Sequence, residues 1–146
     1  MEPEYLPLSE NPSFCQILRL KTILYNSNRG IGRIMSWLVF AWKLCFLNFG
    51  NDSPDIVIVS SPSLISCLAA ETLARKAGAK FVFEFRDIWP DSIVELGKLS
   101  KFNPAIWLLY KLEKRAMIMS DHIIHTMEGG KQYVEAKSGQ GKKCIW

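Results

Sequence analysis

Two apolar runs decide the fold: Asp55-Ile-Val-Ile-Val-Ser-Ser-Pro62 and Lys80-Phe-Val-Phe-Glu-Phe85. Each has strand length, is rich in β-branched or aromatic residues and is bounded by turn residues, as is typical of a parallel strand buried on both faces. Between them, Ser63 is suited to cap a helix, and Gly78 is suited to end it. Strand, helix and strand in this order predict a right-handed βαβ unit.

The alternation continues towards the C-terminus. Residues 91–97 predict a short helix or turn, and Asn103-Pro104 is an N-cap with proline at the first helical position, which predicts a helix to residue 119. A third short strand is expected at 121–126 and a final helix at 131–137. The sequence therefore predicts an α/β protein with a Rossmann-like, doubly wound parallel sheet.

The ends of the chain predict less structure. Residues 1–16 carry three prolines and no periodicity, so an irregular lead-in is expected there. Residues 17–25 suit either a short strand or an irregular extended segment. The domain is expected to span 17–137, and 138–146 is expected to be a truncated tail without a complete element.

Residues 31–49 form the most apolar segment and predict a helix. The run is shorter than the roughly 20 residues that a membrane span needs, and Lys43 interrupts it. Trp42 and Phe46 beside basic residues suit a helix on a membrane interface. A helix packed in the α/β layer explains the same composition, and one helix can do both with different faces.

Composition narrows the function classes. A chain of 146 residues with 49% hydrophobic residues suits one domain with a buried core. The net charge of +4 suits an anionic ligand or surface, but it is too small and too scattered to indicate nucleic acid.

The cysteines and the N-terminus indicate an intracellular protein. The four cysteines are far apart and include no C-x-x-C, so neither a zinc site nor a disulfide framework is expected. His122 and His125 would lie on opposite faces of a strand, so we expect no metal site from this pair. The N-terminus lacks the pattern of a signal peptide, which favours a cytoplasmic location.

The second apolar run ends in charged and aromatic residues: Glu84, Arg86, Asp87 and Trp89. Ligands of open α/β sheets bind beyond the carboxyl ends of the strands, where these side chains would lie. Arginine binds phosphate or carboxylate through two hydrogen bonds, a carboxylate can orient or deprotonate a hydroxyl, and tryptophan can stack on a sugar. The alternative is a local salt bridge between Arg86 and Asp87, with Asp87 as a helix cap.

Three further side chains are candidates at the same edge. Ser60 and Ser61 end the first strand, where they can offer hydroxyls to an anion or simply cap the next helix. His125 ends the third strand and is a weaker candidate for ligand contact. No P-loop, dinucleotide fingerprint or nucleophile elbow is present.

These residues resemble the amino-terminal domain of family 4 glycosyltransferases. Residues 55–62 and the run E-x-R-D-x-W-P-x-S at Glu84–Ser92 are similar to the subgroup of N-acetyl-fucosamine transferases in bacterial surface-polysaccharide synthesis, such as lipopolysaccharide. Supporting matches are residues 21–42, Leu112–Lys114, Ser120–Asp121 and Thr126–Gly129. The resemblance covers about residues 17–137.

The resemblance implies one half of a GT-B fold, the acceptor-side domain of a retaining enzyme that needs no metal. On this basis Asp87 is the candidate catalytic residue, with Glu84, Arg86, Trp89, Ser60, Ser61 and His125 as candidate substrate-binding residues. The implied acceptor is a polyprenyl-pyrophosphate-linked sugar or a polysaccharide, at the inner face of the cell membrane.

Two parts of the family pattern are missing from this sequence. The opening strand with its glycine-rich loop is not visible, and neither is the nucleotide-sugar domain with its E-x7-E pair. The chain is therefore expected to be a fragment that is inactive alone, with a partner chain supplying the donor domain and its nucleotide sugar. The alternative is a non-catalytic remnant or binding module with the same fold.

Overall fold

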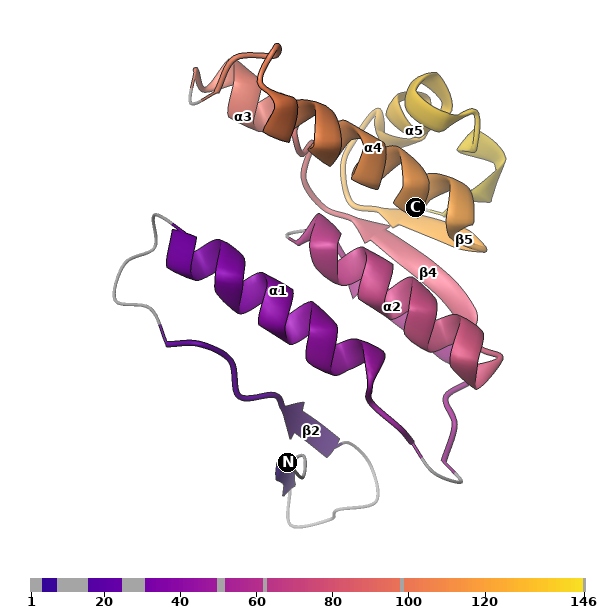
Figure 1. Ribbon diagram of the computed structural model, residues 1–146. Helices are drawn as coiled ribbons and strands as arrows, with labels where there is room; N and C mark the ends of the chain where they lie inside the picture. Colours follow the sequence, from indigo (N-terminus) through magenta and orange to yellow (C-terminus); the bar gives the residue numbers. More distant parts are fainter. Residues whose placement is uncertain are drawn as a thin grey trace.

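The computed structural model describes residues 4–7, 16–24, 31–49, 52–61, 63–97 and 99–145. Its centre is a four-stranded, all-parallel sheet in the order β3-β4-β5-β6, of which β4 and β5 are labelled in Figure 1. The strands are β3 (Ile56–Ser60), β4 (Lys80–Phe85), β5 (His122–His125) and β6 (Cys144–Ile145). Helices flank this sheet, so the predicted α/β, Rossmann-like class is confirmed.

The helices are α1 (Ile31–Cys45), α2 (Leu64–Ala77), α3 (Asp91–Glu95), α4 (Pro104–Met119) and α5 (Gly130–Ser138). Their predicted caps are present. The Ser63 side chain accepts a hydrogen bond from the Ser66 N–H, and Asn103 accepts one from the Ala105 N–H. Gly78 ends α2 at φ 69°, a left-handed conformation that glycine adopts without strain.

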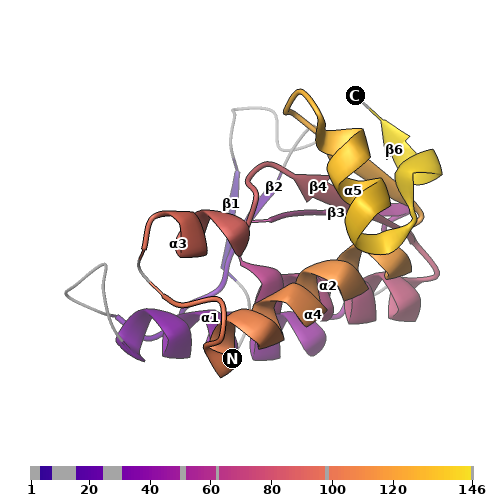
Figure 2. The ribbon, with the colours of Figure 1, turned by 90° about the horizontal axis from the view of Figure 1, so that it is seen from above.

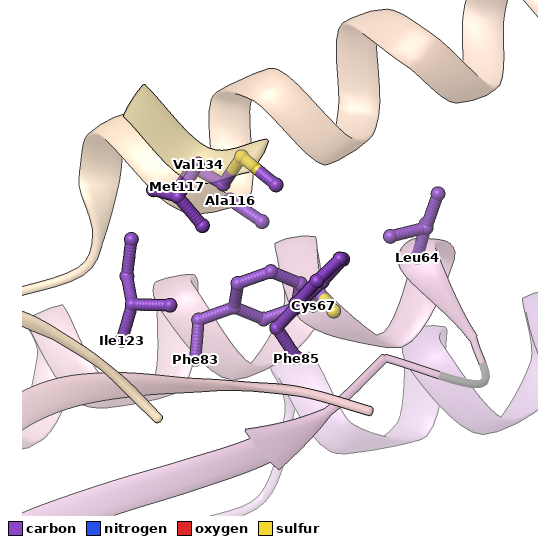
Figure 3. Close-up of a cluster of buried hydrophobic side chains, with 8 residues drawn as sticks. All are labelled: Leu64, Cys67, Phe83, Phe85, Ala116, Met117, Ile123 and Val134. Carbon is purple, nitrogen blue, oxygen red and sulfur yellow. The ribbon is translucent and has the colours of Figure 1, made fainter. Parts of the chain in front are cut away.

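The main core lies between the sheet and the helices (Figure 3). Phe83 and Phe85 point from β4 towards Met117 of α4 and Val134 of α5, and Ile123 of β5 joins them. Leu64, Cys67 and Ala116 complete this buried cluster. The odd-numbered residues of β4 therefore face the helical layer.

The described helices that pack on the sheet cover one face of it. Because the strand order runs in one direction, right-handed crossovers place the connecting helices on the same side. Figure 2 shows α1, α2 and α4 together on one side. On the other side, Ile56 and Ile58 of β3 are more than half exposed, whereas Val57 and Val59 pack against the core. The described strands thus follow one another across the sheet in a single direction, with their connecting helices on one face.

Two expectations about the ends of the chain were wrong. Within the lead-in, β1 (Glu4–Pro7) pairs antiparallel with β2 (Gln16–Arg19), and Pro7 lies at the end of its strand, where its missing N–H is tolerated. Residues 20–24 are irregular. In the tail, a 3-10 turn (Gly141–Lys143) leads into β6, whose Cys144 pairs with Ile123 of β5. A strand of two residues has no periodicity by which its sequence could reveal it.

Among the described residues, no helix has both the length and the apolar character required to cross a bilayer.

Candidate functional site at the carboxyl ends of the strands

Ser60 and Glu84 meet at the carboxyl ends of β3 and β4. They are paired in the register of the two strands, and the Ser60 hydroxyl donates a short hydrogen bond to the Glu84 carboxylate. Both are half-buried on the face without helices. The structure therefore brings these candidates together, but as partners of each other.

Ser61 holds the loop that follows β4. Its buried hydroxyl oxygen accepts hydrogen bonds from the backbone N–H groups of Arg86, at 3.1 Å, and Asp87, at 3.4 Å. The Ser61 N–H donates to the Glu84 carbonyl oxygen at 2.9 Å. Ser63 rather than Ser61 caps α2, so the contact made by Ser61 is to the loop and not to the helix.

The side chains of Arg86 and Asp87 extend into solvent from this fixed backbone. Both residues are exposed, and within the described part of the chain neither side chain makes an ion pair. Asp87 does not cap α3, because the N-cap position is occupied by Pro90. The local salt bridge and cap that would explain these two residues structurally are therefore not formed.

Trp89 and Pro90 continue the loop. Trp89 is half-buried, and its backbone N–H donates to the Asp87 carbonyl oxygen at 2.8 Å. The Trp89–Pro90 peptide bond is cis. Pro90 is fully buried. The indole ring is thus partly available to a ligand beside Arg86 and Asp87.

Asp91 fixes the far end of the loop. Its carboxylate accepts a short hydrogen bond from the Tyr110 hydroxyl and one of 2.8 Å from the Tyr133 hydroxyl, and it pairs with Lys137 Nζ at 3.0 Å. Burial acts to raise the pKa of Asp91, but these hydrogen bonds from Tyr110, Lys137 and Tyr133 lower it below its usual value. Three elements, α3, α4 and α5, are joined at this carboxylate.

Glu113 of α4 lies behind this group. Its residue is only 2% exposed, and one carboxyl oxygen is 3.1 Å from the Tyr133 hydroxyl oxygen. Burial raises the pKa of Glu113 to about 8, against the opposing effects of Tyr133 and Lys137. The sequence reasoning did not identify this group. A signal existed, because Glu113 lies on the same face of α4 as the buried Ile106 and Met117, where an apolar residue is expected.

His125 is the last residue of β5 and is only 5% exposed. Its ring Nδ1–H donates to the Met127 carbonyl oxygen at 3.1 Å. A Cβ atom added to Gly130 would lie 2.7 Å from the His125 ring, so the first residue of α5 rests directly on the imidazole. His125 thus supports the start of α5.

His122 is exposed on the opposite face of the strand. The residues that the structure describes contain no group of three metal-ligating side chains. A hollow of about 620 Å³ beside α5, lined by residues such as Lys131, Glu135 and Lys142, shares no residue with the Glu84–Asp91 edge.

Fold and geometry together define an α/β domain with an exposed, oppositely charged pair on a loop that is fixed at both ends. A comparison with protein-family models finds no match, and a search of curated proteins likewise finds none.

Proposed function

We propose that this chain is the acceptor-side half of a retaining glycosyltransferase similar to family 4 enzymes. The observation that carries the proposal is the exposed Arg86–Asp87 pair, held by Ser61 on one side and by the Asp91 hydrogen bonds on the other. Neither side chain makes an ion pair within the described residues, and two exposed charged side chains on a fixed backbone suit contact with a ligand.

In this role Arg86 would bind the pyrophosphate of a polyprenyl-pyrophosphate-linked sugar, or a carboxylate of a polysaccharide, through two hydrogen bonds. Asp87 would orient the acceptor hydroxyl and accept its proton. Trp89 would pack against the sugar ring. Glu84 and Ser60 would support this edge through their mutual hydrogen bond.

The described residues contain one Rossmann-like sheet and no second domain opposite it. We propose that a separate donor domain, such as one on a partner chain, binds the nucleotide sugar, and that the described domain alone transfers no sugar. A binding module without catalysis is the second candidate, since the same edge would hold a ligand without a donor.

The test adds a short-chain polyprenyl-pyrophosphoryl N-acetylhexosamine to the protein and detects its binding by changes in the backbone amide chemical shifts in NMR spectra. We expect shifts at residues 84–91, at least tenfold weaker binding for Arg86→Ala, and no hydrolysis or transfer when a nucleotide sugar is added. The Asp87→Asn variant should still bind the acceptor, but it should transfer no sugar in a complex whose wild type is active. Because the Asp87 side chain is exposed, this variant should change the free energy of unfolding by less than about 0.5 kcal/mol relative to the wild type.

The two candidates differ in the partner-dependent step. If the acceptor binds but no partner with a donor domain restores transfer, the binding module is favoured. No shifts at residues 84–91 would rule out both, and transfer by the chain alone would refute the partner requirement.

A further inference from the structure

The Tyr133 hydroxyl lies between two carboxyl groups and has one proton to share. Its oxygen is 2.8 Å from Asp91 Oδ2, and 3.1 Å and 3.4 Å from the two carboxyl oxygens of Glu113. A phenol donates one hydrogen bond, and an ionised carboxylate donates none. The shorter contact to Asp91 takes the Tyr133 proton, so the contact to Glu113 is a hydrogen bond only if Glu113 itself donates.

The charges around Glu113 agree with this assignment. Lys137, the cation that faces it from α5, pairs with Asp91 at 3.0 Å, and Tyr110 of α4 also donates to Asp91. On α2, Glu71 is occupied by Arg75 and by Arg115 of α4. From the sheet, Phe85 stacks on the Tyr133 ring with centroids 5.2 Å apart and offers no charge. The cation that acts on Glu113, Lys137, is thus engaged by Asp91.

We propose that Glu113 is a positioning residue, held protonated at neutral pH, whose hydrogen bond to Tyr133 begins a directed chain from Glu113 through Tyr133 to Asp91. This chain fixes the Arg86–Asp91 loop on α4 and α5. The inference goes beyond the proposed function, because it concerns how the loop is held and applies whatever ligand the loop binds.

Ionisation of Glu113 removes the first donor of the chain. The Tyr133 hydroxyl oxygen and the Glu113 carboxylate oxygen would then be two acceptors 3.1 Å apart in a buried site. This repulsion destabilises the position of Tyr133 and, through it, the hydrogen bond to Asp91. Because burial raises the pKa of Glu113 from 4.5 to about 8, the folded protein binds this proton more tightly than the unfolded chain. The resulting stabilisation is complete below the ordinary pKa and is lost as the pH rises to about 8.

The test compares the full chain with Glu113→Gln, whose amide can still donate to Tyr133 but cannot ionise. Urea unfolding gives the folding equilibrium constant of each protein at each pH. The constant of Glu113→Gln divided by that of the wild type should rise at least a hundredfold between pH 5 and pH 9. Hydrogen exchange of residues 86–95, corrected for the intrinsic effect of pH, should lose protection above pH 8 in the wild type only.

Tyr133→Phe is the matched control, since it keeps the ring that stacks on Phe85 and removes only the hydroxyl. We expect lower protection of residues 86–95 at every pH, with no further loss above pH 8. The carboxyl ¹³C signal of Glu113 in the wild type reads the proton directly and does not depend on any variant folding. Titration of this carboxyl below pH 5.5, or parallel pH profiles for wild type and Glu113→Gln, would overturn the proposal.

Discussion

At the scale of single residues, Ser60 at the end of β3 and Ser61 directly after it have different roles. Ser60 faces the side of the sheet without helices and bonds to Glu84, whereas Ser61 is buried and accepts from two N–H groups of the loop after β4. The two adjacent hydroxyls therefore have different partners. Ser61 acts on the site only through the loop.

We therefore expect Ser61→Ala to destabilise the protein by about 1–2 kcal/mol, because the N–H groups of Arg86 and Asp87 lose their acceptor. Urea unfolding followed by circular dichroism measures this. The control is Ser53→Ala at an exposed position, which should change the free energy of unfolding by less than about 0.5 kcal/mol. Equal effects at the two serines would show that Ser61 does not hold the loop.

The position of the candidate loop could be predicted from the sequence, and its supports could not. Glu84 to Asp91 follow an apolar run, and that change of composition is visible along the chain. Tyr110, Glu113 and Tyr133 come from other helices and meet Asp91 only through the packing of α4 and α5. The burial of His125 under α5 could not be predicted for the same reason, since only the fold places Gly130 over its ring.

At the scale of elements, α1 packs on the core with one face, and its outer face stays a candidate for a membrane interface. Ser36 and Ala41 are buried, and Leu44 packs against the core beside α2. On its outer side, Trp42 is 64% exposed and Phe46, just after the helix, is 70% exposed. The ring of Phe46 lies near the Lys76 ammonium, so cations border the apolar surface. This arrangement suits insertion into an anionic membrane interface.

We expect the protein to sediment with vesicles that contain phosphatidylglycerol at low salt. Binding should be at least tenfold weaker when Trp42 and Leu38, which is 42% exposed on the same helix, are both replaced by Gln. Each replacement removes apolar surface that contributes roughly 1.5–3 kcal/mol when fully buried. Binding should also weaken as salt rises, because salt screens the basic residues.

Ile58→Gln is the matched control for this experiment. Ile58 is similarly exposed but lies on the sheet face opposite the helices, so this variant should bind like the wild type. If neither variant changes binding, or the wild type does not sediment, α1 has no membrane role.

At the scale of the whole molecule, β3 has a composition that does not match its place. Both of its faces are apolar, as expected for a central strand of a covered parallel sheet. Within the described residues, however, β3 lies at the edge of the sheet, and only its Val57 and Val59 pack against the buried core. Edge strands in proteins are normally protected by charges, prolines or bulges, and Ile56–Val59 carries none of the charges or prolines. The sequence pattern predicted a strand buried on both faces, and this prediction is wrong for β3, whose Ile56 and Ile58 are more than half exposed.

Ile58 and Ile123 test this one-sided packing with the same substitution. Ile123 is 0% exposed in the core, so Ile123→Ala should cost about 2–5 kcal/mol through lost burial and an unfilled cavity. Ile58 is 60% exposed, so Ile58→Ala should cost less than about 1 kcal/mol in dilute solution. Urea unfolding at low protein concentration gives both values.

Sedimentation at rising protein concentration should show self-association that Ile58→Lys weakens, because an uncovered apolar face favours contact between copies. If Ile58→Ala instead costs as much as Ile123→Ala at the lowest concentration, the second face of the sheet is covered in solution, and the packing of β3 would then match its composition.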